Sequence, residues 1–248
     1  MARASTAAKK EQGKTKTADV YENLKRDIVS GVWMPGTKLP IGDLRDVYDV
    51  SLSPLREALS RLAAVGFVIA EGQRGFTVAP MSEEHLIDTN RIRTTLECMA
   101  VTESIENGDT DWEANMIAAF HRLASTSYLD PEDPSSTSTL WTTYHKEFHD
   151  SLVAACQSFW ILRFRETLSD EMERFRNLSY GFTARKRSYA KAHSKKDADP
   201  FELDHKKILD AALARDSEKA CKLIEKHFSK TVEIVLAEKS AFAEEALS

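Results

Sequence analysis

The sequence is poor in residues that break helices and in residues that form covalent cross-links. Among 248 residues there are nine glycines, seven prolines and three cysteines. So few glycines and prolines, with few alternating β-branched runs, predict a mainly α-helical fold. Cys98, Cys156 and Cys221 are odd in number and far apart within apolar helical patterns. They are therefore expected to be reduced core residues of a cytoplasmic protein rather than a disulfide framework.

Long apolar runs and signatures of catalysis are also missing. No stretch approaches the length of a membrane span and no signal peptide is recognisable, so we expect no membrane partner and a cytoplasmic location. Neither a glycine-rich phosphate loop nor a G-x-S-x-G nucleophile motif is found. Residues 1–17 are basic and rich in Ser, Thr and Ala, which predicts a disordered tail able to contact DNA phosphates.

Charge is distributed unevenly along the chain. The formal net charge of −5 combines a net +3 over residues 1–80 with a net −8 over residues 81–248. A mildly basic first part beside an acidic remainder fits nucleic-acid contact that is limited to the first part.

The stretch LRDVYDVSLSPLREALSRL, residues 44–62, predicts two short helices joined by a turn at residues 49–51. Ser53 is expected to cap the second helix, with Pro54 at its first position and Gly66 just beyond its end. Apolar residues repeat at helical spacing in both: Leu44, Val47 and Tyr48, then Leu55, Ala58, Leu59 and Leu62. The polar face of the second helix carries Arg56 and Arg61. An arginine-bearing second helix suits the DNA major groove, although an ordinary helical hairpin has the same pattern.

Residues that follow this pair of helices favour the DNA-binding interpretation. Residues 67–70 and 76–79 predict two strands joined by the turn Glu71-Gly72-Gln73-Arg74-Gly75. A helix over residues 19–30 precedes the pair, and a short extended piece is expected at residues 38–39. Three helices followed by a β-hairpin predict a winged helix–turn–helix DNA-binding domain over residues 18–80.

Here the motifs resemble a known family. Three motifs resemble the N-terminal domain of GntR-type bacterial transcription regulators. They are PGTKLP, then SPLREALSRL, then the hairpin pattern G-F-x-I-x-x-G-x-R-G-F-x-V. The family usually has an arginine just before the S-P step and another early in the second helix, where this chain has Leu52 and Gly42. Arg56 matches a family arginine and is our candidate for base readout. The complete set of candidate DNA-binding residues is Arg45, Ser53, Arg56, Arg61, Gln73, Arg74 and Gly75.

Almost everything after a short linker at residues 80–82 is predicted to be helical. The expected segments are 83–106, 111–127, 139–156, 158–180, 200–214 and 216–246, with a charged, partly mobile loop at 184–199. This antiparallel all-α bundle, residues 83–246, resembles the FCD ligand-sensing domain of the FadR subfamily. The resemblance implies an effector-binding and dimerisation domain.

Two histidines lie at metal-ligand spacing in this bundle. His145 and His149 are four residues apart, so their rings lie on one helix face. In the family that the chain resembles, an Asp and a His at this spacing bind a divalent metal together with two later histidines, which correspond to His205 and His227. His145 stands in the Asp position, so an all-imidazole site is expected, which favours Zn²⁺ or Ni²⁺. His121 has no partner at this spacing and is interpreted as structural.

Arg93 lies in an R-x-x-x-E motif of the first bundle helix. The resemblance implies that it holds the carboxylate of an effector, whereas its spacing from Glu97 equally allows an ion pair within the helix. Arg163, Arg165, Arg174 and Arg176 add positive charge and are expected mostly at the surface. A metalloprotease is disfavoured because Lys146 stands where H-E-x-x-H has its general base, and because Glu147 points away from the metal.

We therefore expect a DNA-binding transcription regulator, acting as a repressor and not an enzyme. It would bind operator DNA as a homodimer and respond to a small organic acid held at a divalent metal in the helical domain. One alternative is the same regulator with a metal-free pocket for an acyl or sugar-acid effector. Another, from a different class, is a metal-dependent enzyme with a degenerate DNA module.

Overall fold

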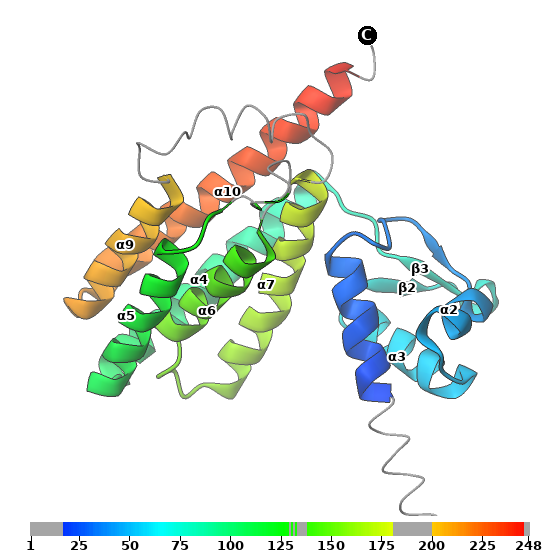
Figure 1. Ribbon diagram of the computed structural model, residues 1–248, viewed down its shortest axis with the longest axis horizontal. Coiled ribbons are helices and arrows are strands. Elements are labelled where there is room, and N and C mark those ends of the chain that lie inside the picture. Colours follow the sequence, from blue (N-terminus) through cyan, green and yellow to red (C-terminus); the bar gives the residue numbers. More distant parts are fainter. Residues whose placement is uncertain (1–16, 129, 131, 133–137, 181–199, 246–248) are drawn as a thin grey trace, which may run out of the picture. The chain divides into compact units, whose positions relative to one another are not determined.

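The computed structural model describes residues 17–128, 130, 132, 138–180 and 200–245 (Figure 1). The expected basic tail, apart from Thr17, and the charged loop at 184–199 lie outside the described residues. The chain divides into two compact units, one extending to Ser82 and including Glu173–Leu178, the other containing the remaining residues. Helices dominate and the only described sheet is small, so the predicted mainly α fold with an N-terminal winged helix–turn–helix is confirmed.

The first unit is a three-helix structure with a short antiparallel sheet. Its helices span residues 17–29, Ile41–Tyr48 (α2) and Leu52–Ala64 (α3). The strands are Lys38–Leu39 (β1), Val68–Ala70 (β2) and Phe76–Val78 (β3), in the order β1-β3-β2. In this sheet β3 pairs with both neighbours, with Ile69 and Lys38 both opposite Thr77. The extended piece predicted at residues 38–39 thus becomes the third strand of the wing sheet.

The core of this unit follows the predicted apolar stripes. Fully buried side chains come from all three helices and the sheet: Val20, Leu24, Ile28, Leu39, Leu44, Leu55, Ala58, Leu59, Leu62, Phe67, Val68 and Val78. Val47 is 61% exposed, however, so its predicted place on the apolar face is wrong. Gly66 has a φ of +89°, as expected for the residue beyond the end of a helix.

The predicted start of α3 is also wrong by two residues. Ser51, with extended backbone angles, precedes the first helical residue, Leu52, and Ser53 lies inside the first turn. Pro54 is tolerated there because the first-turn N–H groups of a helix have no intrahelical acceptor. The helix therefore needs no side-chain cap at Ser53.

The second unit is an all-α bundle. Its helices are Glu83–Asn107 (α4), Thr110–Ala124 (α5), Thr139–Leu152 (α6), Phe159–Tyr180 (α7, except for Glu173–Leu178), Pro200–Leu213 (α9) and Ser217–Glu245 (α10). Side chains of Asp109 and Ser138 accept hydrogen bonds from the first turns of α5 and α6 and fix where these helices begin. No helix in the described part of the chain is long and apolar enough to cross a membrane.

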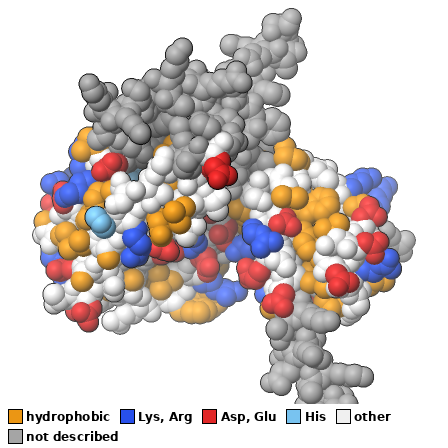
Figure 2. Space-filling model, in the orientation of Figure 1, with side chains coloured by type: hydrophobic (Ala, Val, Ile, Leu, Met, Phe, Trp, Pro, Cys, Tyr) orange, Lys and Arg blue, Asp and Glu red, His pale blue; other side chains and the backbone are white. Residues whose placement is uncertain are grey.

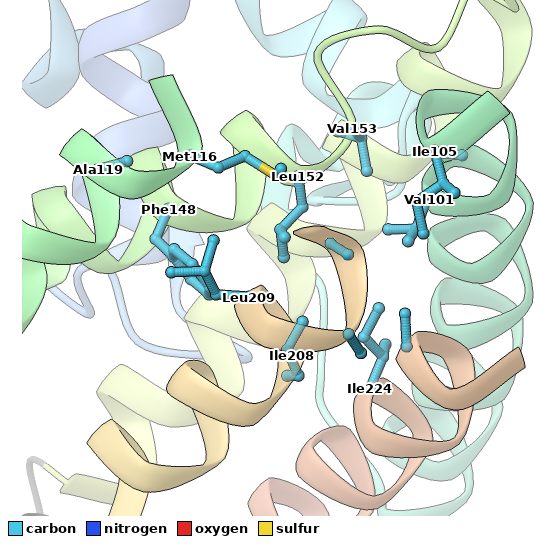
Figure 3. Packing of buried hydrophobic residues seen from close by; sticks show 14 of the residues in the cluster. Val101, Ile105, Met116, Ala119, Phe148, Leu152, Val153, Ile208, Leu209 and Ile224 are labelled. Carbon is cyan, nitrogen blue, oxygen red and sulfur yellow. The ribbon is translucent and has the colours of Figure 1, made fainter. Parts of the chain in front are cut away.

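The bundle core is built where α4, α5, α6, α9 and α10 meet. Figure 3 shows side chains from these helices pointing toward one another, among them Val101, Met116, Phe148, Ile208 and Ile224. Cys156 belongs to this core, as predicted. Cys98 and Cys221 are partly exposed instead, so the expectation that all three cysteines are core residues is wrong.

Candidate functional sites

Four histidines from three helices meet inside the bundle. His145 and His149 lie on α6, His205 on α9 and His227 on α10, and each is at most 5% exposed. One ring nitrogen from each can be chosen so that all four lie within 4.8 Å of one another. The i,i+4 spacing of the pair on α6 therefore does place both rings on the face that meets α9 and α10.

The size of this cluster suits a single metal ion. Zinc binds imidazole nitrogen at about 2.0–2.1 Å with tetrahedral geometry, so two nitrogens on one ion lie about 3.3–3.4 Å apart. The largest separation of 4.8 Å is thus wider than in a loaded site, and the four nitrogens must approach one another by about 1.4 Å at most to bind one ion. Small side-chain rotations would close the four nitrogens on one ion.

His149 provides the internal evidence that the cluster fits a metal. Both its ring nitrogens are buried and neither has a hydrogen-bond partner within the described residues. Buried polar atoms are rarely left so, and a metal ion is one of the groups that satisfies them. Burial, followed by the nearby imidazoles and Arg93, lowers the pKa of His149 well below its usual value. The ring is therefore held neutral, which is the form that binds a metal.

Aromatic rings enclose the cluster. Trp141 stacks on His145 with ring centroids 4.7 Å apart, one turn before it on α6. The rings of Phe148 and Phe228 lie within 6 Å of His205 and His149 respectively. Such an apolar wall lowers the local dielectric constant and strengthens interactions with charged ligands.

Arg93 lies beside the histidine cluster. Its side chain is buried, and its guanidinium stacks on the Phe228 ring at 3.6 Å from the centroid. The Phe228 ring in turn lies 5.7 Å from the His149 ring, centroid to centroid, so Arg93 is next to the cluster, and its positive charge helps to lower the pKa of His149. Cationic Arg93 and a metal ion would together make this interior strongly attractive to an anion.

Glu97, the other residue of the R-x-x-x-E motif, is bound by Arg165 on α7. The Arg165 guanidinium donates to both Glu97 oxygens at 2.6 and 3.2 Å, and both side chains are buried. Arg165 and Arg174 are both buried, so the expectation that the arginines of residues 163–176 lie mostly at the surface is wrong, although Arg163 is exposed. The pair joins residues 68 positions apart, which local spacing cannot reveal.

Arg165 also supports the backbone of α6. It donates to the carbonyl oxygen of His149 at 2.9 Å and to the carboxylate of Asp150 at 2.8 Å. Glu97 Oε1 in turn lies 4.0 Å from Nδ1 of His149. The arginine and the glutamate therefore position His149 from behind, a role that sequence reasoning missed.

The metalloprotease alternative has no support in this geometry. Glu147 lies at the surface, 44% exposed at its side chain, where it pairs with Arg122 at 3.2 Å. Lys146 is likewise outside, bound to Asp150 at 2.5 Å. Neither side chain can act as a general base on a ligand at the histidine cluster.

The candidate DNA-reading helix presents a polar outer face. Ser53, Arg56 and Arg61 on α3 are exposed, opposite the buried leucines. Arg61 lies over the ring of Tyr21 at 4.1 Å, which fixes the orientation of its guanidinium. Arg45 on α2 is exposed and pairs with Asp46 at 2.8 Å. All of these candidate side chains lie in the first unit and are exposed, whereas Arg93 and Arg165 are buried.

The turn of the wing is held in a special backbone conformation. Gly72–Arg74 form a single 3₁₀ turn, and Gly75 follows with φ +97° and ψ −139°. Only glycine adopts that combination without strain, so Gly75 acts through its backbone. Arg74 is exposed at the tip, whereas the side chain of Gln73 lies outside the described part of the chain.

Two hydrogen bonds hold α2 against the remainder of the winged unit. The Tyr48 hydroxyl donates to Asp27 at 2.7 Å and accepts from the Trp33 indole at 2.9 Å.

Figure 2 shows Lys and Arg side chains interspersed with Asp and Glu on the visible face of the molecule. Because charges of both signs lie on this face, DNA contact would depend on individual arginines rather than on a broad positive field.

Comparison with known families agrees with this architecture. Residues 16–78 match the model for bacterial regulatory proteins of the gntR family, and residues 88–230 match the FCD domain. The chain belongs to the GntR family of regulators and carries an FCD domain. The family that the motifs indicated is therefore confirmed, and the protein is a DNA-binding transcription regulator with an FCD effector domain.

Related regulators match over most of their length. The chain is 35% identical to the HTH-type transcriptional regulator BphR of Paraburkholderia xenovorans, over 87% of this chain and 83% of BphR. It is 33% identical to the HTH-type transcriptional repressor GlaR of Escherichia coli, over 88% of this chain and 94% of GlaR. These relatives are regulators rather than enzymes.

Structural comparison supports the same fold. McbR/YncC of Escherichia coli superimposes with a TM-score of 0.71 at 21% identity, covering 90% of this chain and 98% of that one. At this level of identity the likeness concerns the fold alone.

Proposed function

We propose that this GntR regulator is a repressor whose operator binding is relieved by a small carboxylate bound at a metal ion in the FCD bundle. The observation that carries the proposal is the buried cluster of four histidines with Arg93 beside it. Repression rather than activation is chosen because GlaR, a relative over nearly its whole length, is named a repressor. The regulator would act on chromosomal DNA in the bacterial cytoplasm.

His145, His149, His205 and His227 would hold the ion. Four neutral imidazoles favour Zn²⁺, with Ni²⁺ as the second choice, because these ions accept nitrogen ligands readily. The bound ion would supply a positive centre that accepts a carboxylate oxygen of the effector. Glu97 and Arg165 support the ring and the backbone of His149 and so act as positioning residues.

Arg93 would bind the effector carboxylate directly. A buried guanidinium pairs with a carboxylate through two parallel hydrogen bonds, and the apolar ring of Phe228 beneath it keeps water away. A lysine at this position would retain the charge but lose the paired geometry. We therefore expect an Arg93→Lys variant to bind the effector more weakly than wild type while retaining its metal.

Arg56 would read bases in the operator. It is exposed on α3, and a bidentate contact from arginine to guanine is worth about 1–3 kcal/mol. Arg74, Gln73 and the backbone at Gly75 would contact the minor groove or phosphates from the wing. Arg45, Ser53 and Arg61 would add phosphate contacts, which fix the register of the protein on the duplex.

A homodimer would bring two recognition helices to two half-sites. The aromatic side chains of Phe159, Trp160 and Phe164 on α7 support this assembly. They are 64%, 62% and 53% exposed and contact one another with ring centroids 5.2 and 5.7 Å apart. Exposed aromatic clusters of this kind are typical of interface cores, and we assign this α7 patch to a second copy of the chain.

The dimer surface can be tested by sedimentation. A Trp160→Glu variant should sediment as a monomer at concentrations where wild type is a dimer, and its operator affinity should fall. The matched control is Leu203→Glu on α9, an exposed apolar residue outside the patch. Dimers of unchanged stability in Trp160→Glu would place the interface elsewhere.

The regulatory proposal is tested by fluorescence anisotropy with labelled DNA from upstream of its own gene. An Arg56→Ala variant should bind this DNA about 5- to 150-fold more weakly, the equivalent of 1–3 kcal/mol. Arg91→Ala, which removes an exposed arginine from α4, should bind as wild type does.

Small mono- and dicarboxylates are then added to the wild-type complex with and without a chelator. Release of DNA only in metal-loaded protein supports the proposal. Release that persists after chelation and metal removal would favour the alternative of a metal-free pocket. Equal affinities of wild type and Arg56→Ala would overturn the assignment of α3.

A further inference from the structure

Two cysteines from distant parts of the sequence face each other where α4 packs on α10. Cys98 Sγ lies 3.9 Å from the carbonyl oxygen of Cys221, and Cys221 Sγ lies 3.7 Å from the carbonyl oxygen of Cys98. Each side chain thus points at the other's backbone, which is the convergence of Cβ directions that a disulfide requires.

We propose that Cys98 and Cys221 are a redox-sensitive pair that is oxidised to an intramolecular disulfide by hydroperoxides. Nothing in the metal and effector site uses these residues. Both are partly exposed. An open groove lined by Cys98, Met99, Thr102, Glu103, Glu106 and Ile161 reaches the pair on the Cys98 side, and the partial exposure of Cys221 lets a small oxidant reach its sulfur.

The environment distinguishes the roles of the two sulfurs. Hydrogen bonds from Cys98 and Thr102 stabilise a thiolate at Cys221 and lower its pKa to about 7. The same pairing, with burial, raises the pKa of Cys98. At neutral pH a substantial fraction of Cys221 is therefore thiolate, the nucleophilic form, while Cys98 keeps its proton.

The reaction proceeds in two steps. The Cys221 thiolate attacks one oxygen of the hydroperoxide, the O–O bond breaks, and the leaving alkoxide or hydroxide takes a proton from solvent. Cys221 is then a sulfenic acid. The Cys98 sulfur attacks Cys221 Sγ, the S–O bond breaks, and hydroxide leaves with the Cys98 proton as water. The two sulfurs lose one electron each, and the peroxide receives both.

Cys156 provides a matched control within the same bundle. It is buried, its thiol donates to the Glu103 carboxylate at 3.1 Å, and burial raises its pKa. It therefore has neither the thiolate character nor the access of Cys221.

The disulfide would join the two helices that carry Arg93 and His227. Relative movement of α4 and α10 would then be restricted next to the histidine cluster. That consequence depends on the proposed function, whereas formation of the disulfide does not.

The test treats the reduced full-length protein with stoichiometric hydrogen peroxide, blocks remaining thiols by alkylation and maps peptides without reductant. A linked peptide pair containing Cys98 and Cys221, two hydrogen atoms lighter than the sum of its parts and separated by reductant, is expected. Cys156→Ser should form the same link as fully as wild type. Cys98→Ser should accumulate a sulfenic acid at Cys221, detected with dimedone.

Two results would overturn the proposal. One is that Cys98 and Cys221 stay reduced under peroxide that oxidises free glutathione. The other is that the disulfide found involves Cys156 or joins two chains. Because the wild-type map alone decides between these outcomes, the conclusion does not depend on the folding of a variant.

Discussion

Removal of Arg165 should destabilise the bundle far more than loss of a surface charge. An Arg165→Met variant keeps the length of the side chain but leaves the Glu97 carboxylate buried without the guanidinium that now holds both its oxygens. Breaking a buried ion pair from one side costs about 3–5 kcal/mol, because the remaining charge stays desolvated. The contact of Arg165 with Asp150, whose side chain is 42% exposed, should add little to this.

A double-mutant cycle makes the argument quantitative. In Arg165→Met/Glu97→Leu both charges are gone, and apolar replacement of a buried pair is often neutral or favourable. The double variant should therefore be more stable than Arg165→Met alone. Arg122→Met is the matched control, since its partner Glu147 is almost half exposed and such pairs are worth about 0–1 kcal/mol.

The assay is urea unfolding of the bundle, followed by far-ultraviolet circular dichroism in metal-free buffer. A large loss in Arg165→Met, partial recovery in the double variant and a small loss in Arg122→Met are expected. If Arg165→Met loses no more stability than Arg122→Met, the reasoning that Glu97 and Arg165 form one desolvated unit is refuted. Purely additive losses in the double variant would refute it as well.

Three further predictions concern single residues. His149 has a lowered pKa, so below about pH 6.5 the unfolded chain binds a proton that the folded chain does not. The free energy of unfolding of the metal-free protein should thus fall as pH decreases from 6.5, and a flat profile between pH 7.5 and 5.5 in urea titrations would contradict this. Tyr48→Phe removes the hydroxyl between Asp27 and Trp33 and should cost the winged unit about 1–3 kcal/mol in thermal unfolding, whereas an unchanged melting temperature would count against that role. Gly75→Ala forces a β-carbon into a backbone conformation that favours glycine, so it should lower the free energy of unfolding by about 1–3 kcal/mol and weaken operator binding in anisotropy titrations. Wild-type affinity and stability in this variant would show that the wing does not need that conformation.

Local patterns predicted most of the helices because each depends on neighbouring residues. The buried stripe Leu55, Ala58, Leu59 and Leu62 followed directly from spacing, and so did the rings of His145 and His149 on one face. The start of α3 was misplaced because a proline fits several positions of a first turn. Leu52 therefore begins the helix, although Ser53-Pro54 resembled a cap.

Contacts between distant residues could not be predicted in the same way. Arg165 lies on a helix where three aromatic side chains face outward and the arginine faces inward, the reverse of the usual arrangement. Spacing along α4 offered Arg93 as a partner for Glu97, whereas Arg165 binds both Glu97 oxygens from another helix. The meeting of Cys98 and Cys221 likewise depends on how α4 packs on α10.

The proposed regulation depends on the four histidines binding one divalent metal ion. Isothermal titration of chelator-stripped full-length protein with Zn²⁺ tests it most directly, with His149→Ala as the variant and the exposed His121→Ala as the control. We expect one ion per chain for wild type and His121→Ala, and affinity lower by at least about tenfold in His149→Ala. Absence of binding by wild type with both Zn²⁺ and Ni²⁺, or equal affinity in His149→Ala, would contradict it.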